Sequence, residues 1–376
     1  MRAAHRPAAA LVLWPLAVGS LVHLLVGSAT GEARDLRILW RSADAFAGGG
    51  PLYDPGTEFL YPPVSAWVLA PLGLLPFRVA VVVVSTASVA ALVASALLLL
   101  RGVGVRAGTP SGSVVTAGTL LLLATSRPVV GLLRLGNVDV LLLLVLTVAT
   151  GLLTRRRDAS AAVLLAAAAA VKPVLLPALG ALLLLGRVRA LLVGAGAFLA
   201  LTLVGFLTVG DAGTFTARVV PLLAAGNRPE LAPYDRSLQS AVEQLGLPTG
   251  VGTVLRVLVV VLTCWVCLRR RHAPGAAAEV LPLVLLAAVL TSSFAWADYG
   301  IYLLPLLVGV ARPDALARSW LVWVGVYLAT TTDAWHVDQL PPLPDALLRL
   351  LPCWGWLLVL AGCALQARRT WSPNPG

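Results

Sequence analysis

Charged side chains are scarce in this chain of 376 residues, where they make up 12%. A soluble globular domain carries about 25%. Lysine is nearly absent, because Lys172 stands alone among 28 basic residues. So little charge beside 59% hydrophobic residues excludes a soluble domain of ordinary composition. The net charge of +11 does not indicate a nucleic-acid partner, because the arginines stand beside apolar runs, where they are typical of membrane orientation signals.

Residues and motifs for metal, nucleotide and redox chemistry are also missing. The four histidines are scattered, and Cys264 and Cys267 form a C-x-x-C pair inside an apolar run. Redox or metal chemistry needs accessible thiolates, so we interpret these cysteines as small hydrophobic residues. The sequence has no G-x-G-x-x-G after a strand, no Walker motif, no H-E-x-x-H and no D-x-D. We therefore expect no metal and no cofactor.

What the chain does have is long apolar runs. Runs of about 18 or more residues indicate membrane spans, and these must be helical because lipid offers the backbone no hydrogen-bonding partners. We expect about 10 to 12 transmembrane helices, since 159–172 and 174–186 form either one helix kinked at Pro173 or a re-entrant pair. The expected segments are 8–29, 79–100, 114–127, 138–153, 159–172, 174–186, 190–209, 251–268, 277–292, 300–311, 319–332 and 347–366. The sequence thus predicts an all-α polytopic membrane protein.

The charges between these segments indicate an orientation. We call a loop between two expected spans, or an end of the chain outside them, a joint. With a cytoplasmic N-terminus, every joint on the inner side carries at least two arginines, as the positive-inside rule expects. Most acids and the arginines that violate the rule then fall outside, where ionisable groups at membrane depth are candidates for function. Two long outer joints, 30–77 and 210–250, interrupt a single membrane domain over 1–366, and 367–376 is a cytoplasmic tail. We expect short interfacial helices in the first joint, broken at Gly48-Gly49-Gly50 and at Tyr61-Pro62-Pro63.

Asp35 follows the first apolar segment and stands between Arg34 and Arg37. Neighbouring cations favour the charged form of a carboxylate. We therefore expect an ionised Asp35 that can act as a general base towards a hydroxyl group. A solvated surface acid is the alternative interpretation.

The first long joint also resembles a known family. Its residues Asp35, Ser42-Ala43-Asp44, Gly49-Gly50-Pro51-Leu52-Tyr53-Asp54 and Phe59-Leu60-Tyr61-Pro62-Pro63 resemble the first outer loop of glycosyltransferase family 87, whose members are multi-span enzymes of the C-type glycosyltransferase fold. Four later segments fit in order, so the resemblance spans about residues 10–310. These are Arg134-Leu135-Gly136-Asn137-Val138-Asp139, Lys172-Pro173, Ser237-Leu238-Gln239-Ser240 and Ser292-Ser293-Phe294-Ala295-Trp296-Ala297-Asp298-Tyr299.

The resemblance implies an enzyme that moves a sugar from a polyprenyl-phosphate donor to a glycolipid or cell-envelope glycan, with its active site on the extracytoplasmic face of the cell membrane. Mannose is the expected sugar, because the similar actinobacterial enzymes use polyprenyl-phosphate mannose. An arabinofuranosyltransferase that uses the matching lipid donor is the alternative. A secondary transporter or lipid flippase is a rival of another class, since such proteins also carry buried charges and broken helices.

The implied reaction requires a base for the acceptor hydroxyl and a cation for the departing phosphate. Asp35 is one expected base, and Asp298 is the other, standing where the family has a histidine. The expected phosphate-binding residues are Lys172, Arg127, Arg134 and Arg236, although arginines at helix ends also serve as membrane anchors. Further expected substrate contacts are Asp44, Tyr53, Tyr61, Asn137, Asp139 and Trp296.

Overall fold

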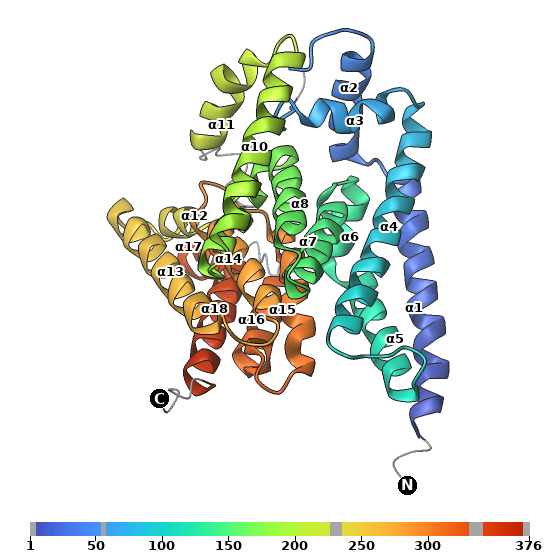
Figure 1. The fold of residues 1–376 in the computed structure, drawn as a ribbon, viewed down its shortest axis with the longest axis vertical. Helices are drawn as coiled ribbons and strands as arrows, with labels where there is room; N and C mark the ends of the chain where they lie inside the picture. Colours follow the sequence, from blue (N-terminus) through green and yellow to red (C-terminus); the bar gives the residue numbers. More distant parts are fainter. Residues whose placement is uncertain (1–4, 54–57, 226–234, 331–340, 371–376) are drawn as a thin grey trace. The chain divides into compact units, whose positions relative to one another are not determined.

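The computed structural model describes residues 5–53, 58–225, 235–330 and 341–370, and all regular structure within them is helical (Figure 1). The chain forms two compact units. Unit 1 comprises Met1–Pro173 and Val193–Val219, and unit 2 comprises Val174–Leu192 and Val220–Gly376. The predicted all-α fold is therefore confirmed for the described residues.

Unit 1 is built around a packed set of long helices. Its elements are α1 (His5–Thr30), α2 (Arg34–Ala47), α3 (Ser65–Gly73), α4 (Phe77–Gly102), α5 (Pro110–Thr125), α6 (Arg127–Leu135), α7 (Asp139–Thr154), α8 (Asp158–Val171), most of α10 (Val188–Thr208) and a π-helical turn (Phe215–Val219). Helix α1 packs against α4 and α5, α4 against α7, and α7 against α8. The indole N–H of Trp14 donates to Ser113 Oγ over 2.8 Å, which ties α1 to α5.

The first long joint folds into two short helices, as the sequence predicts. Helix α2 ends at Ala47, directly before the three glycines, and α3 begins at Ser65, directly after the Tyr-Pro-Pro segment. The two helices pack closely because Gly73 has no side chain. A Cβ atom there would collide with the backbone of Ala43.

Unit 2 contains the remaining helices. They are a 3-10 turn η1 (Pro173–Leu175) at its border, α9 (Pro177–Leu184), α11 (Val220–Ala225), α12 (Leu238–Gln244), α13 (Thr249–Arg270), α14 (Ala276–Thr291), η4 (Ala297–Leu303), α15 (Leu304–Val308), η5 (Gly309–Ala311), η6 (Leu316–Arg318), α16 (Trp320–Thr330), α17 (Pro342–Arg349) and α18 (Leu351–Arg369). Helix α14 packs against α9 and α13, and α16 packs along α18.

Among the described residues, four helices are long and apolar enough to cross a membrane: 8–30, 77–102, 188–208 and 249–270. The count rises to six if α5 with α6, and α17 with α18, each form one span bent by 57°. The expected number, about 10 to 12, also included shorter apolar runs, which this criterion of length does not count. The other expected segments coincide with apolar helices of 10–17 residues, such as α7 and α14.

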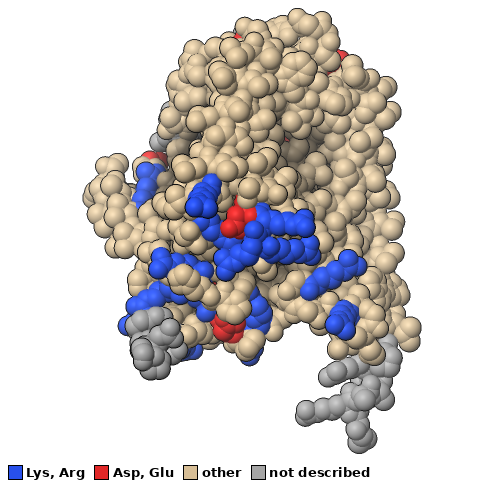
Figure 2. All heavy atoms as spheres, viewed as in Figure 1, with Lys and Arg blue, Asp and Glu red and all other residues tan. Residues whose placement is uncertain are grey.

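The surface of these long helices is apolar. Leu11 on α1 is 76% exposed and Leu207 on α10 is 75% exposed. Figure 2 shows one face of the molecule, on which basic side chains gather in a few groups and wide areas carry no charge. Monomeric soluble proteins rarely expose contiguous apolar surface on this scale. The surface is that of a membrane protein with several spans.

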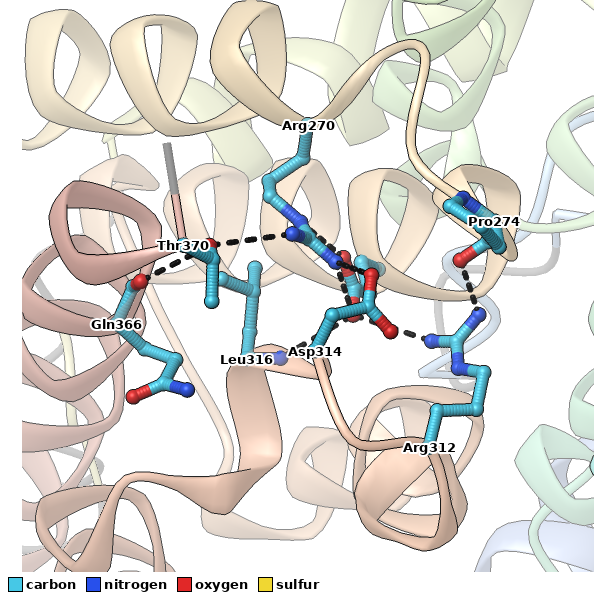
Figure 3. Close-up of polar contacts among 8 residues, drawn as sticks. Arg270, Pro274, Arg312, Asp314, Leu316, Gln366 and Thr370 are labelled. Carbon is cyan, nitrogen blue, oxygen red and sulfur yellow. Dashed lines mark hydrogen bonds and ion pairs between the residues drawn. The ribbon is translucent and has the colours of Figure 1, made fainter. Parts of the chain in front are cut away.

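A group of charges around a buried carboxylate, which we call the Glu279 cluster (Arg270, Glu279, Arg312 and Asp314), joins the ends of helices in unit 2 (Figure 3). Glu279 in the first turn of α14 is fully buried. It accepts from Arg270 Nε over 2.8 Å and from Arg312 Nη2 over 3.1 Å. Arg270 Nη2 also donates to Asp314 over 3.0 Å. These arginines, expected as orientation signals, therefore also hold three segments of the chain together.

One glycine makes this cluster possible. Gly275, which precedes α14, has φ +73°, and a Cβ atom there would overlap the guanidinium of Arg312. Arg312 Nη1 can therefore donate to the carbonyl oxygen of Pro274 over 2.6 Å, as Figure 3 shows.

Candidate functional site

Five of the predicted site residues meet in unit 1, in a group that we call the Asp35 cluster (Asp35, Tyr61, Asn137, Asp139 and Lys172). They come from α2, from the segment before α3, from the joint between α6 and α7, and from the end of α8. Their positions in the sequence run from 35 to 172, so only the fold brings them together.

Local backbone geometry places the asparagine beside the carboxylate. Gly136 ends α6 with φ +70°, a left-handed conformation that glycine adopts at little cost. A Cβ atom at Gly136 would press on the Cβ of Leu36, so glycine also allows this joint to approach α2. The next residue, Asn137, then donates from Nδ2 to Asp35 Oδ2 over 2.9 Å.

Asn137 also fixes the start of α7. Its Oδ1 accepts the backbone N–H of Asp139 over 3.0 Å, which is the pattern of an Asx turn. The two ends of one amide therefore link the Asp35 carboxylate to the backbone of Asp139. We conclude that Asn137 sets the spacing between the two acids.

Lys172 reaches the same place because it leaves its helix. It follows the last residue of α8 with φ −136° and ψ 101°, an extended conformation favoured before Pro173. Its Nζ lies 2.5 Å from Asp139 Oδ1 and 5.9 Å from the centre of the Tyr61 ring. The side chains are 13% exposed for Lys172 and 1% exposed for Asp139, so this is a partly buried ion pair with a neighbouring aromatic face.

The pKa of Asp35 is shifted in the direction opposite to the expectation. Burial raises the pKa of the Asp35 carboxyl, while the hydrogen bond from Asn137 and then the charge of Lys172 act in the opposite direction. Arg34 favours the ionised form, as expected, but burial outweighs it and the net shift of the pKa is upward. Arg34 faces solvent and pairs with Glu58 over 3.8 Å, so it contributes little.

Tyr53 lies inside the loop and not at a free surface. It is 5% exposed, its hydroxyl donates to the carbonyl oxygen of Tyr61 over 2.8 Å, and its backbone N–H donates to Asp211 Oδ2 over 2.7 Å. Its ring packs between Phe59 and Phe215. Burial raises the pKa of both Tyr53 and Tyr61, so neither phenol ionises near neutral pH. Tyr53 thus shapes the loop that carries Tyr61.

Three other predicted residues lie in unit 2. Arg236 is 5% exposed, and its backbone N–H donates to the carbonyl oxygen of Ala295 over 2.8 Å. Trp296 is 39% exposed and its ring packs edge-on against Phe294 at 4.8 Å. Asp298 lies in the first turn of η4 and is partly buried. Unit 2 therefore brings the segment of Arg236 next to the segment of Trp296 and Asp298.

The remaining predicted residues lie on the surface of unit 1. Arg127 begins α6 and Arg134 lies in its last turn, and both are exposed. Asp44 is exposed on α2. Within the described part of the chain, no group of three or more His, Cys, Asp and Glu residues is arranged to hold a metal ion.

Asp235 is a buried residue that the sequence analysis missed. Its carboxylate accepts from Ser237 and from the backbone of Ala295, 60 residues away. The spacing Asp-x-Ser before a helix is a weak sequence signal of such a turn. The contact with Ala295 depends on the fold and has no signal in the sequence.

Comparison with known proteins agrees with the resemblance. The family model of glycosyltransferase family 87 matches residues 59–293, more than half of the chain. The chain is 27% identical over 365 residues to an alpha-(1->3)-arabinofuranosyltransferase of Mycobacterium tuberculosis, covering 93% of this chain and 82% of that protein. It is 26% identical over 375 residues to the alpha-(1->3)-arabinofuranosyltransferase of Mycolicibacterium smegmatis, covering 95% of this chain and 85% of that protein.

Proposed function

The chain belongs to glycosyltransferase family 87, and from this premise we propose that it transfers an arabinofuranosyl group from a polyprenyl-phosphate donor to a glycolipid or cell-envelope glycan. Membership of the family makes it a glycosyltransferase, which requires a sugar donor and a glycan acceptor. The observation that carries the proposal is the Asp35 cluster, in which Asn137 links the partly buried carboxylate of Asp35 to Asp139, and Asp139 in turn pairs with the cation of Lys172.

Arabinofuranose has more support than mannose as the transferred sugar. The relatives described above are arabinofuranosyltransferases and align with more than nine tenths of this chain. The sequence resemblance alone favoured mannose, and the comparisons favour the alternative. The rival classes of transporter and flippase receive no support from membership of a glycosyltransferase family.

The proposed step needs one proton acceptor and one anchored cation. Asp35 accepts the proton of the acceptor hydroxyl, whose oxygen forms a bond to the anomeric carbon. The bond between that carbon and the phosphate oxygen breaks, and polyprenyl phosphate leaves with the electron pair. Lys172 stabilises the negative charge that develops on this phosphate. Because Asp139 and Tyr61 hold Lys172 in place, the cation is positioned before the donor arrives.

The other predicted contacts follow the same chemistry. Arg236, Arg127 and Arg134 are proposed to contact the donor phosphate, because guanidinium groups bind phosphate with two parallel hydrogen bonds. Trp296 offers an exposed ring face to a sugar. Asp298 is the second candidate for the base. We propose that the reaction occurs on the extracytoplasmic face of the cell membrane, because the expected inner joints carry the arginines that orient the chain.

The identity of the sugar donor can be tested with the purified protein in proteoliposomes. Two labelled lipids, polyprenyl-phosphate arabinofuranose and polyprenyl-phosphate mannose, are offered in separate assays with an arabinan or mannan oligosaccharide acceptor. We expect transfer of arabinofuranose and little transfer of mannose. Transfer of mannose alone would reverse the choice of sugar. Movement of labelled lipid between leaflets without any glycosidic product would favour the flippase class.

Lys172→Ala should lower both stability and transfer. It leaves Asp139 buried without its ammonium partner, and breaking a buried ion pair in this way costs about 3–5 kcal/mol. The double variant Lys172→Ala/Asp139→Ala removes both charges. Its apparent melting temperature in detergent should therefore recover towards that of the wild type while transfer stays lost.

The control for the two Lys172 variants, in both melting temperature and transfer, is Arg101→Ala, which removes an exposed arginine from the end of α4 in the same unit. It should change neither quantity. If the double variant recovered transfer together with stability, Lys172 would have no role at the donor phosphate.

A further inference from the structure

The segment that contains Arg236 is held by a buried carboxylate of its own. Asp235 is 6% exposed and lies shortly before α12. Its Oδ1 accepts the backbone N–H groups of Ser237 and Ala295, each over 2.9 Å. Its Oδ2 accepts from Ser237 Oγ over 3.1 Å. One carboxylate therefore satisfies three donors, two on its own segment and one on the segment before η4.

A second bond completes the link between the two segments. The backbone N–H of Arg236 donates to the carbonyl oxygen of Ala295 over 2.8 Å. Ala295 thus donates its N–H to the side chain of Asp235 and accepts the N–H of Arg236 at its carbonyl oxygen. We call this pair of hydrogen bonds the ladder. Ala295 is fully buried, so solvent cannot replace these bonds if one partner is removed.

The ladder fixes two predicted substrate contacts at once. Arg236 follows Asp235 in the chain, and Trp296 follows Ala295, so the four residues form two adjacent pairs. Ser237 Oγ also caps α12 by accepting the N–H of Ser240 over 3.2 Å, which joins the same turn to a helix. The side chains of Arg236 and Trp296 therefore start from backbone positions that cannot shift independently.

We propose that Asp235 is a positioning residue for donor binding, which holds the Arg236 and Trp296 segments of unit 2 in register. It touches no substrate. Its effect reaches the donor through Arg236, which contacts the phosphate, and through Trp296, which contacts the sugar. This inference rests on the proposed function, because it assumes a donor with both a phosphate and a sugar.

Two substitutions separate hydrogen bonding from charge. Asp235→Ala removes all three acceptor contacts. Asp235→Asn keeps one carbonyl oxygen, which can still accept from the backbone of Ser237 and Ala295. If Asp235 acts by geometry, the Asn variant should restore the donor KM to near the wild-type value. The Ala variant should raise the donor KM about tenfold, which corresponds to the loss of about one charge-assisted hydrogen bond.

A double-mutant cycle tests whether the effect passes through Arg236. Adding Asp235→Ala to Arg236→Ala should raise the donor KM little further. A misplaced arginine and a missing arginine should weaken phosphate binding to a similar extent. The acceptor KM should stay unchanged in all three variants. A merely structural role would lower the melting temperature and the yield, but it would leave the donor KM of the folded protein as in the wild type.

Binding of polyprenyl phosphate alone, measured with the 376-residue chain in nanodiscs, tests the positioning role without turnover. We expect Asp235→Ala to weaken this binding and to speed hydrogen exchange in peptides that cover 292–299. Unchanged binding, or effects of Asp235→Ala and Arg236→Ala that add in full, would overturn the positioning role. Absence of transfer by the wild type from every lipid donor, with binding still weakened in Asp235→Ala, would instead refute the proposed function.

Discussion

Asp35→Asn should reduce the rate of sugar transfer about 10²–10⁴-fold, the usual contribution of a positioned general base. Asparagine has the same shape, and its side-chain oxygen can still accept from Asn137, so the fold should persist. What is lost is the ability to take the proton of the acceptor hydroxyl. The measurement is kcat with a saturating donor, together with the melting temperature as a check on folding.

The pH dependence of the same reaction gives a second readout. A base must be deprotonated, so activity rises with pH through the pKa of Asp35. Because burial raises that pKa, the acid limb of kcat/KM should lie above the usual aspartate range. Asn137→Ala removes a hydrogen bond that lowers the pKa, so it should move the limb to still higher pH.

The matched control is Glu58→Gln, which neutralises an exposed acid in the same loop. It should change neither the rate nor the acid limb. Near-full activity of Asp35→Asn would remove Asp35 as the base and leave Asp298 as the remaining carboxylate with that assignment.

Glu279→Ala should strongly destabilise unit 2. Glu279 is fully buried and lies between Arg270 and Arg312, so its removal leaves two guanidinium groups without their shared carboxylate. Losing one partner from a buried ion pair costs about 3–5 kcal/mol. The backbone N–H of Leu316 loses its acceptor as well. We expect a large fall in apparent melting temperature in detergent and a low yield of folded protein.

Two further variants show whether charge or shape matters in the Glu279 cluster. Glu279→Gln keeps the size and one acceptor oxygen but not the charge, so its melting temperature should lie between those of the wild type and Glu279→Ala. Glu243→Ala removes an exposed acid on α12 in the same unit and should have little effect. If Glu279→Ala melted like Glu243→Ala, the cluster would contribute nothing to stability.

Much of the helical framework could be predicted from the sequence, because lipid forces apolar runs into helices. The expected segment 138–153 is α7 shifted by one residue, and 277–292 is α14 shifted by one residue. The sequence says less about which of these helices cross the membrane on their own. Proline, glycine and serine interrupt several runs, and the sequence does not say whether a short helix continues across such a break.

The composition of the Asp35 cluster could be predicted, but its internal contacts could not. Asp139 was expected to touch substrate, and the structure pairs it with Lys172. That contact depends on the extended backbone at Lys172. The contact of Asn137 with Asp35 depends on the close approach to α2 that Gly136 permits. The substrate roles of these residues remain predictions.

The direction of the Asp35 pKa shift could not be predicted, for a related reason. Residues next to each other on a helix point in different directions, so Arg34 and Arg37 flank Asp35 in the sequence but do not face it. Arg34 is largely exposed, and Arg37 lies over the ring of Phe77 at 4.6 Å. Burial, which the sequence does not report for a single residue, decides the direction of the pKa shift.

A density map of the protein in nanodiscs with polyprenyl phosphate bound tests most directly whether the Asp35 cluster holds the donor. We predict that the phosphate lies in hydrogen-bonding contact with Lys172, with the carboxylate of Asp35 facing the space that the sugar and acceptor would occupy. Phosphate bound instead among the arginines of the 154–158 joint, with the Asp35 cluster unchanged, would contradict it.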